Sequence, residues 1–307
     1  MSLIPGKNNL DSLAGWCINA PLYANLFVLM NIYKVLPDLT NERQMRLWYQ
    51  GIRKQWSAED INWKKALPKL SKSNLDDLAK VLTPVLTGEQ SALYSVSGLI
   101  PVLGHRSEVE GQFYLTTWAV DEARHTELFA RYYHRLDREP LPIRRFPAGY
   151  LFQSRIISKE PAEWLTGVLV SETVAQTVSH EFREADIDPV LSEICDGILE
   201  DEARHLGFNH VYMCDRFKDL YEKDGEEAAE SFAAHLEKRR KYVLEGVEPI
   251  MEALKDEMDA IGLDRERILH TVSTVTKRRL EKSILAGRKA TQGVKIKDED
   301  LIVAVGQ

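Results

Sequence analysis

The five-residue word DEARH occurs twice in this chain, at residues 121–125 and again at 201–205. In each copy a glutamate precedes a histidine by three positions, a spacing that puts both side chains on one face of an α-helix. Two such faces turned toward each other would bring two carboxylates and two imidazoles together. Buried carboxylates need a compensating positive charge, and carboxylate oxygen with imidazole nitrogen suits iron, manganese or zinc. The repeat therefore predicts a metal site.

The residues around both copies indicate burial rather than a solvent-facing charge pair, which is the usual setting of a single E-x-x-H. Apolar residues recur at helical spacing around each copy: Leu115, Trp118, Leu128 and Phe129 around the first, and Ile198, Leu199, Leu206 and Phe208 around the second. A face exposed to water would not be so apolar. We therefore expect both motifs to lie on the buried sides of their helices.

A two-metal site in a helical bundle also needs one glutamate from each of two further helices. The stretch 73–100 contains a single acid after Leu78, which is Glu89, and the stretch 160–184 has Glu172 in the middle of apolar residues. The order along the chain becomes Glu, Glu-x-x-His, Glu, Glu-x-x-His. The predicted metal ligands, which are also the predicted catalytic residues, are Glu89, Glu122, His125, Glu172, Glu202 and His205.

The elements that must position these residues are helical throughout. Apolar positions recur at threes and fours between proline and glycine breaks, and the predicted helices are 12–35, 41–56, 73–100, 107–136, 160–184, 188–221, 225–261 and 264–286. Long helices joined by short connections favour an antiparallel bundle. We expect an all-α fold, with a four-helix core and flanking helices, in one domain over residues 1–288. The metal-ligand helices would lie within about 73–221, followed by a C-terminal tail over 289–307.

The six-ligand set resembles that of the ferritin-like di-iron carboxylate proteins. The D-E-x-R-H form of both motifs is similar to the hydroxylase subunits of bacterial multicomponent monooxygenases. The segment KQWSAEDINW at 54–63 resembles one in the ribonucleotide reductase small subunit and in the related ligand-binding oxidases. The resemblance implies a ferritin-like bundle that holds two iron ions, or manganese with iron, and uses O2 as co-substrate.

The same resemblance implies roles for the residues beside the ligands. Asp121 and Asp201 would each accept a hydrogen bond from the metal-bound histidine of the opposite motif. Arg124 and Arg204 would neutralise the surplus acid around them. Residues one turn from the ligands are candidates for the substrate pocket, and those predicted are Leu93, Trp118, Phe129, Gln176 and Ile198.

The function implied is that of an O2-activating oxidase or monooxygenase, acting on a small or elongated organic substrate by hydroxylation, N-oxygenation or a related oxidation. A radical-generating reductase small subunit and a ferroxidase or iron store stay open as alternatives. At single positions this chain differs from each of the families that it resembles. The reductase stores its radical on a tyrosine where this chain has Phe129, and the ligand-binding oxidases cross-link a valine to a tyrosine at the positions of Ala92 and Gly167. Multicomponent hydroxylases have a threonine at the position of Gln176, and arylamine N-oxygenases have an additional histidine at that of Ile198.

Composition and charge indicate which kinds of partner this chain is expected to have. A formal net charge of −7 and an isoelectric point near 5.7 provide no basic surface for nucleic acid. No leader pattern and no run of 18 uncharged apolar residues occurs, so we expect no membrane association and a cytoplasmic location. Three cysteines without C-x-x-C spacing favour reduced thiols. Expected partners are a small-molecule substrate, an electron donor or reductase, and a second copy of the chain, because the predicted helix 12–35 is more apolar than one bundle face requires.

Overall fold

The computed structural model describes residues 36–40, 42–68 and 70–294, and this part of the chain is helical with no strand. The prediction of an all-α fold is therefore confirmed, while the predicted helix 12–35 lies outside the described residues. In chain order the elements are α2 (Glu42–Arg53), the 3-10 turn η3 (Ala58–Asp60), α3 (Lys72–His105), α4 (Val109–Leu136), the 3-10 turn η4 (Ile143–Arg145), α5 (Pro147–Ile156), α6 (Pro161–Glu184), α7 (Pro189–Asp224), α8 (Glu226–Leu244), α9 (Val247–Ala253), α10 (Lys255–Ala260) and α11 (Arg265–Thr291).

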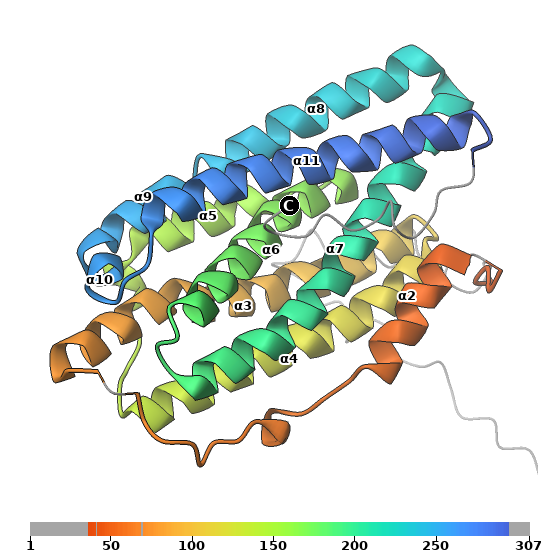
Figure 1. Cartoon of the computed structure of the whole chain (residues 1–307). Helices are drawn as coiled ribbons and strands as arrows, with labels where there is room; N and C mark the ends of the chain where they lie inside the picture. Colours follow the sequence, from red (N-terminus) through yellow and green to blue (C-terminus); the bar gives the residue numbers. More distant parts are fainter. Residues whose placement is uncertain (1–35, 41, 69, 295–307) are drawn as a thin grey trace, which may run out of the picture.

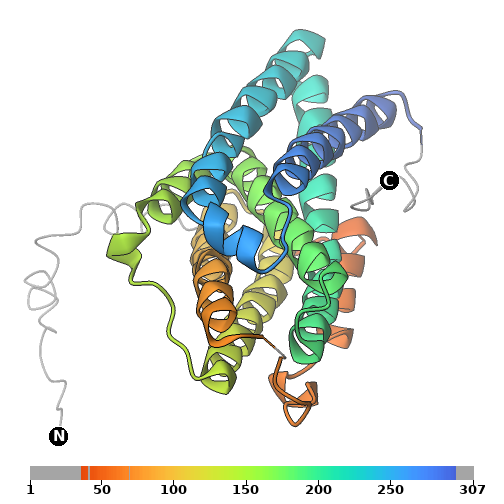
Figure 2. The same ribbon diagram turned by 60° about the vertical axis from the view of Figure 1, so that its left-hand side comes forward.

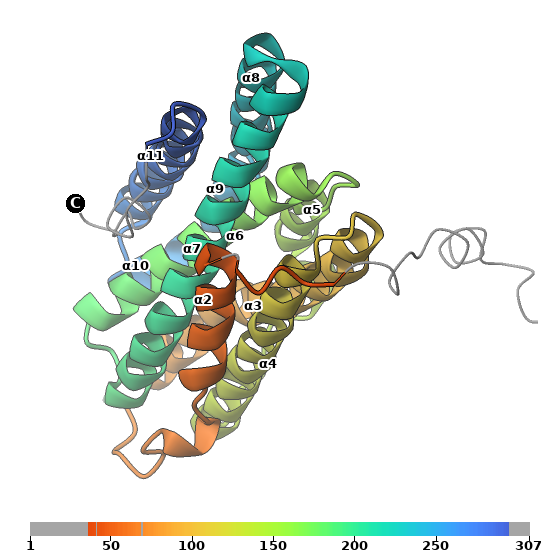
Figure 3. The same ribbon diagram turned by 90° about the vertical axis from the view of Figure 1, so that its right-hand side faces the viewer.

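Four long helices, α3, α4, α6 and α7, form the centre of the molecule (Figure 1). α3 packs along α4 and α6 packs along α7, and further contacts join α3 to α6 and α4 to α7. α2 lies against α4 and α7 (Figure 3), whereas α8 and α11 lie against α6 and α7. The short α10 packs on α3, and in Figure 2 the short blue helices α9 and α10 lie next to the orange start of α3. The arrangement confirms a four-helix core with flanking helices.

A buried capping residue fixes the start of α7. Asp188 accepts a hydrogen bond from the backbone N–H of Val190 at 3.0 Å, which satisfies one of the unpaired donors at a helix N-terminus. Its other carboxylate oxygen accepts a bond from the Tyr132 hydroxyl and pairs with Arg135, both at 2.7 Å. Tyr132 and Arg135 belong to α4. The two helices that carry the DEARH motifs are thus joined at one end.

Some helix boundaries differ from the prediction. The segment 225–261, predicted as one helix, forms α8, α9 and α10. Pro249 has no backbone N–H and cannot continue α8, so a new helix starts instead. The unpredicted α5 begins at Pro147, and proline is well suited to the first position of a helix. α11 continues through Thr291, so the segment 289–307 predicted as a tail begins within a helix.

α5 lies directly against α6 because position 167 has no side chain. A Cβ atom on Gly167 would lie 2.6 Å from the carbonyl oxygen of Ile156 and 2.9 Å from its Cα atom. Both are backbone atoms, which move less readily than the end of a flexible side chain. The resemblance to the ligand-binding oxidases matched Gly167 with their cross-linked tyrosine, and the close approach of the α5 backbone leaves no room for such a side chain here.

Alanine in place of Gly167 is expected to lower the free energy of unfolding by about 1–3 kcal/mol, because the added methyl group overpacks against the α5 backbone. Chemical denaturation measures the change. Gly207→Ala is the matched control, since its Cβ would meet only Leu47 Cδ2 at 3.5 Å, an ordinary contact. Alanine at 207 should be neutral or stabilising by up to about 1 kcal/mol. Equal stability of the two variants would contradict this account of the α5–α6 contact.

Two expectations from composition can be compared with the described residues. Cys195 and Cys214 are buried free thiols, as predicted, and Cys17 lies outside the described part of the chain. Among the helices that the structure describes, none has both the length and the apolar character needed to cross a bilayer.

Candidate metal centre

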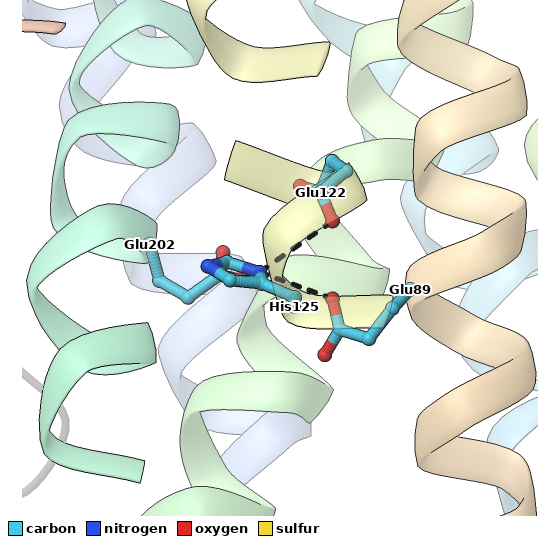
Figure 4. Close-up of side chains that lie close together, drawn as sticks. All are labelled: Glu89, Glu122, His125 and Glu202. Carbon is cyan, nitrogen blue, oxygen red and sulfur yellow. Dashed lines mark hydrogen bonds and ion pairs between the residues drawn. The ribbon is translucent and has the colours of Figure 1, made fainter. Parts of the chain in front are cut away.

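The six predicted ligands converge in the interior of the four-helix core. α3 supplies Glu89, α4 supplies Glu122 and His125, α6 supplies Glu172, and α7 supplies Glu202 and His205. All six are buried, and the most exposed of them, Glu89, retains 4% of its accessible surface. Figure 4 shows three of the glutamates arranged around the His125 ring. We call these six residues the carboxylate cluster.

Ligand atoms of the carboxylate cluster form two overlapping groups. Glu89, Glu122, His125 and Glu202 offer atoms that all lie within 4.8 Å of one another, and Glu122, Glu172, Glu202 and His205 do the same. Ligands about 2.0–2.2 Å from an ion can be at most about 4.4 Å apart, so each group is close to the size of one ion's coordination shell. Glu122 and Glu202 belong to both groups and therefore lie between the two candidate ion positions.

Each histidine ring has one nitrogen toward the cluster and the other toward an aspartate of the opposite motif. His125 Nδ1 lies 3.2 Å from Glu89 Oε2, and its Nε2 lies 3.1 Å from Asp201 Oδ2. In the second motif His205 Nε2 lies 3.3 Å from Asp121 Oδ2. These are the cross-motif contacts that the family resemblance implied. When Nε2 donates to the aspartate, Nδ1 carries its lone pair toward the cluster, which is the tautomer that a metal ion needs.

Two arginines complete this layer of side chains. Arg124 pairs with Asp201 at 2.7 Å, Arg204 pairs with Asp121 at 3.0 Å, and each arginine also pairs with the aspartate of its own motif. Both arginines are buried with 6% of their surface exposed. Each buried aspartate therefore has two guanidinium partners as well as a histidine. The bonds hold Asp121 and Asp201 in fixed positions behind the histidine rings.

The segment 54–63 supplies two further donors to the aspartates. Gln55 Nε2 donates to Asp121 Oδ1 at 2.9 Å, and Trp56 Nε1 donates to Asp201 Oδ2 at 2.9 Å. The two aspartates therefore have matching sets of partners, each with one histidine, two arginines and one donor from the segment 54–63. The hydrogen-bonding role of these two donors was not predicted from the sequence, although the segment itself was singled out by resemblance.

Electrostatics in the cluster favour positive charge. Burial raises the pKa of Glu122 to about 8, and the neighbouring Glu172 adds to the shift. Burial and Glu172 also raise the pKa of Glu202 well above its usual range. Among the described residues, Glu122 Oε2 and Glu202 Oε1 are buried without a hydrogen-bond partner. An unsatisfied buried polar group costs about 1–3 kcal/mol, and more when charged. The oxygen and nitrogen donors present fit two divalent cations.

Trp118 contacts two of the candidate metal ligands. Its indole N–H donates to Glu122 Oε1 at 2.7 Å, and its ring stacks on His205 with 4.4 Å between the centroids. The residue is completely buried. It fixes one oxygen of a shared glutamate and one face of a histidine at the same time.

Arg279 is a buried cation near the cluster that the sequence analysis missed. It reaches from α11 and donates to Thr173 Oγ1 at 2.8 Å and to Gln176 Oε1 at 2.6 Å. Burial lowers the pKa of Arg279 to about 10, although the charges of Glu202 and Glu172 oppose the shift. The sequence does contain a signal, because position 279 falls on the same helical face as apolar residues of α11 such as Val272 and Val275, both buried.

A cavity of about 90 Å³ adjoins the cluster. Glu89, Glu172 and Glu202 form part of its wall, and the remaining wall is mostly apolar side chains from α3, α5, α6, α9, α10 and the start of α11, including Ile250 and Met258. At about 10–15 Å³ for each water, the space equals roughly six to nine water molecules. A small organic molecule could therefore lie beside three of the candidate ligands.

The predicted pocket residues lie elsewhere: Leu93, Trp118, Phe129, Gln176 and Ile198 do not line this cavity. Phe129 and Ile198 are in the apolar core, and Gln176 accepts the bond from Arg279. The prediction is corrected for this cavity, because a residue one turn from a ligand can face either side of its helix and these five do not face the space between α3, α5, α6 and α9. As contacts to substrate the five residues remain a prediction.

Comparison with known proteins agrees with this architecture. The model of the family "P-aminobenzoate N-oxygenase AurF" matches residues 102–270. An R2-like ligand-binding oxidase with an aerobically reconstituted Mn/Fe cofactor superposes with a TM-score of 0.60 at 17% identity, over 81% of this chain and 95% of that chain. The same kind of oxidase after photoconversion gives a TM-score of 0.57 at 15% identity, over 86% and 96%. These identities show the fold alone, which is ferritin-like. No curated protein matches the chain in sequence.

Proposed function

We propose, from the premise that this chain belongs to the p-aminobenzoate N-oxygenase (AurF) family, that it uses a dinuclear metal centre and O2 to oxidise a small or elongated organic substrate. The family model matches more than half of the chain, and membership makes the chain an oxygen-dependent oxidoreductase. The observation that carries the proposal is the convergence of two glutamates and two Glu-x-x-His pairs in a buried core.

The proposed metal ligands are the six residues of the carboxylate cluster. One ion would be held on the side of His125 and Glu89, the other on the side of His205 and Glu172, with Glu122 shared. Glu202 would be the second shared ligand. Two iron ions are the expected pair, and manganese with iron is the alternative, since ligand sets for these metals overlap. When bound, such a pair supplies electrons for the reduction of O2.

The charges of the cluster support two divalent ions. Four glutamates with Asp121 and Asp201 make six carboxylates, and Arg124 and Arg204 offset two of them. Four negative charges remain, which two divalent ions would balance. The protein's own part is to hold the ligands in place through the aspartates and Trp118, and to keep bulk water from the buried site.

N-oxygenation of an amine is the oxidation that family membership favours. The reaction balances as amine, O2, two electrons and two protons giving an N-hydroxylamine and water, so two electrons must come from an outside donor. An electron donor or reductase is therefore a proposed partner. The site has Ile198, completely buried on α7, where the resemblance to arylamine N-oxygenases implied a histidine. The proposed set therefore stays at six ligands.

The remaining predictions about organisation are proposals. One helical domain over 1–288 is supported by a single continuous apolar core among the described residues. A homodimer is supported by the exposed apolar side chains of Ile52 on α2 and Val120 on α4. A cytoplasmic location remains a proposal as well.

The two alternative functions have less support. A reductase small subunit would need a radical-storing tyrosine at the position of Phe129, which is a buried phenylalanine, and nothing observed favours an iron store.

Iron(II)-loaded protein supplied with an arylamine, a reductant and isotope-labelled O2 is expected to form the N-hydroxylamine with the label in the product. Mass spectrometry detects the label, and an oxygen electrode measures consumption. Zinc-loaded protein is the control, since zinc fits the same donors but has no redox chemistry. It should consume no O2 and form no product.

Three results would contradict the proposal. If loaded protein consumed no O2, the chain would not be an oxygen-activating enzyme. A long-lived tyrosyl radical without amine oxidation would favour the reductase alternative. Growth of a ferric mineral with excess iron would favour storage.

A further inference from the structure

Gly88 lies in the middle of α3, where glycine is costly and no local feature requires it. A glycine inside a helix destabilises it by about 0.5–1 kcal/mol relative to alanine. Gly88 does not have a positive φ, and a Cβ atom on it would meet no atom within 4 Å. Neither a turn nor close packing explains the residue. The open space beside it is the cavity next to the carboxylate cluster.

Other small residues surround the same space. Ala92 lies on α3 one turn beyond Gly88, and Ser171 and Ala175 lie on α6 beside and one turn beyond Glu172. Larger apolar side chains, such as Phe152, form much of the remaining wall. These small side chains leave space next to the candidate metal ligands, where a reacting group has to fit.

The wall of the cavity contains no positive charge among the described residues, since its only charged side chains are the three glutamates of the cluster. Its hydroxyl groups are already used as donors. Thr87 Oγ1 donates to the carbonyl oxygen of Thr83 at 3.0 Å, and Ser171 Oγ donates to that of Val168 at 3.0 Å. The Gln153 amide remains as one neutral donor. Away from the carboxylate cluster, an anionic group would find no cation in the described part of this wall.

We propose that Gly88 is a specificity-determining residue that keeps space beside Glu89 for an uncharged, apolar amine, and that the cavity excludes amines carrying a carboxylate, p-aminobenzoate included. The proposal rests on the proposed function only for the choice of an amine. With the amine beside the cluster, a para carboxylate would lie among apolar side chains, where an unpaired charge is far more costly than a neutral group. An alkyl group in the same position gains by being buried.

Binding to the iron(II)-loaded full chain under anaerobic conditions tests the proposal without turnover. Calorimetric titration should show para-ethylaniline binding at least about tenfold more tightly than p-aminobenzoate. Gly88→Leu fills the cavity and is expected to weaken para-ethylaniline binding by at least about tenfold, with metal content unchanged. The variant should fold, because its side chain enters open space and leucine favours helix. Ser97→Leu places the same side chain on the exposed side of α3 and should bind like the unmodified protein.

The results test the inference about the cavity separately from the proposed function. Binding of p-aminobenzoate as tight as that of para-ethylaniline, or unchanged binding by Gly88→Leu, overturns the inference. If para-ethylaniline binds in a manner that depends on Gly88 but loaded protein consumes no O2, the proposed function fails and the inference about the cavity stands. Efficient N-oxygenation of p-aminobenzoate but not of para-ethylaniline would keep the proposed function and overturn the inference.

Discussion

Alanine in place of Glu122 is expected to weaken the binding of both metal ions by more than about 100-fold, whereas alanine in place of Glu89 should weaken the binding of one. Glu122 contributes to both groups of ligand atoms, and Glu89 contributes only to the group that contains His125. Loss of a residue that merely orients a ligand already costs about 10–100-fold in metal affinity or activity. Loss of a shared ligand must cost more, because each ion loses a donor and the two ions lose the anion between them.

Competition with a chelator of known affinity measures both binding constants, and elemental analysis counts the ions that remain. Glu127→Ala is the control, because Glu127 is on the same helix but half-exposed, paired with Arg131 on the surface. Circular dichroism of the metal-free variants checks that they fold. If Glu122→Ala retained two ions, or if it resembled Glu89→Ala, Glu122 would not lie between the metals.

The ligands could be predicted because each lies on a helix whose periodicity is visible in the sequence. Apolar residues around Glu122 and Glu202 mark the buried face of α4 and α7, and a single acid in an apolar helix has to be explained by what it contacts. The order Glu, Glu-x-x-His, Glu, Glu-x-x-His along the four helices then gives six metal ligands. The structure brings these six residues together as expected.

The cross-motif bonds required more than periodicity. The pattern of one helix does not show what faces it across a bundle, so the pairing of Asp121 with His205 and of Asp201 with His125 came from resemblance. Arg279 illustrates the same limit. Its position on the buried face of α11 can be deduced from the sequence, but its bond to Gln176 on α6 depends on how two distant helices pack.

The cavity could not be located from the sequence because residues far apart along the chain form its wall. Ile250 and Met258 reach it because the segment 225–261 breaks after α8, ahead of Pro249, and α9 and α10 then pack on α5 and α3. One continuous helix there would have left the cavity open on that side. Gly88 carried no evident signal either, since a glycine in a helix is informative only once its surroundings are known.

Asparagine in place of Asp201 is expected to weaken metal binding at the His125 side by about 10–100-fold and to leave the His205 side almost unchanged, and Asp121→Asn should do the reverse. Each aspartate accepts from only one histidine ring, that of the opposite motif. Asparagine keeps the shape of the side chain, and Arg124 and Arg204 each retain the remaining aspartate as a partner, so the fold should survive. What is lost is the negative charge that holds the Nε2 proton and makes the opposite nitrogen a better donor to the metal.

Titration with manganese(II), followed by electron paramagnetic resonance, resolves the two affinities. Asp196→Asn on the exposed side of α7, where the residue pairs with Arg183, should change neither. The double variant should show both losses, nearly additive, if each aspartate acts through its own histidine. Loss at both sides from either single variant would mean instead that the aspartates act through the shared arginine layer, because that layer contacts both motifs equally. If each single variant weakens only the ion position of its own histidine, the aspartate acts by orienting that histidine. If each weakens both positions, it acts through the charge of the whole layer.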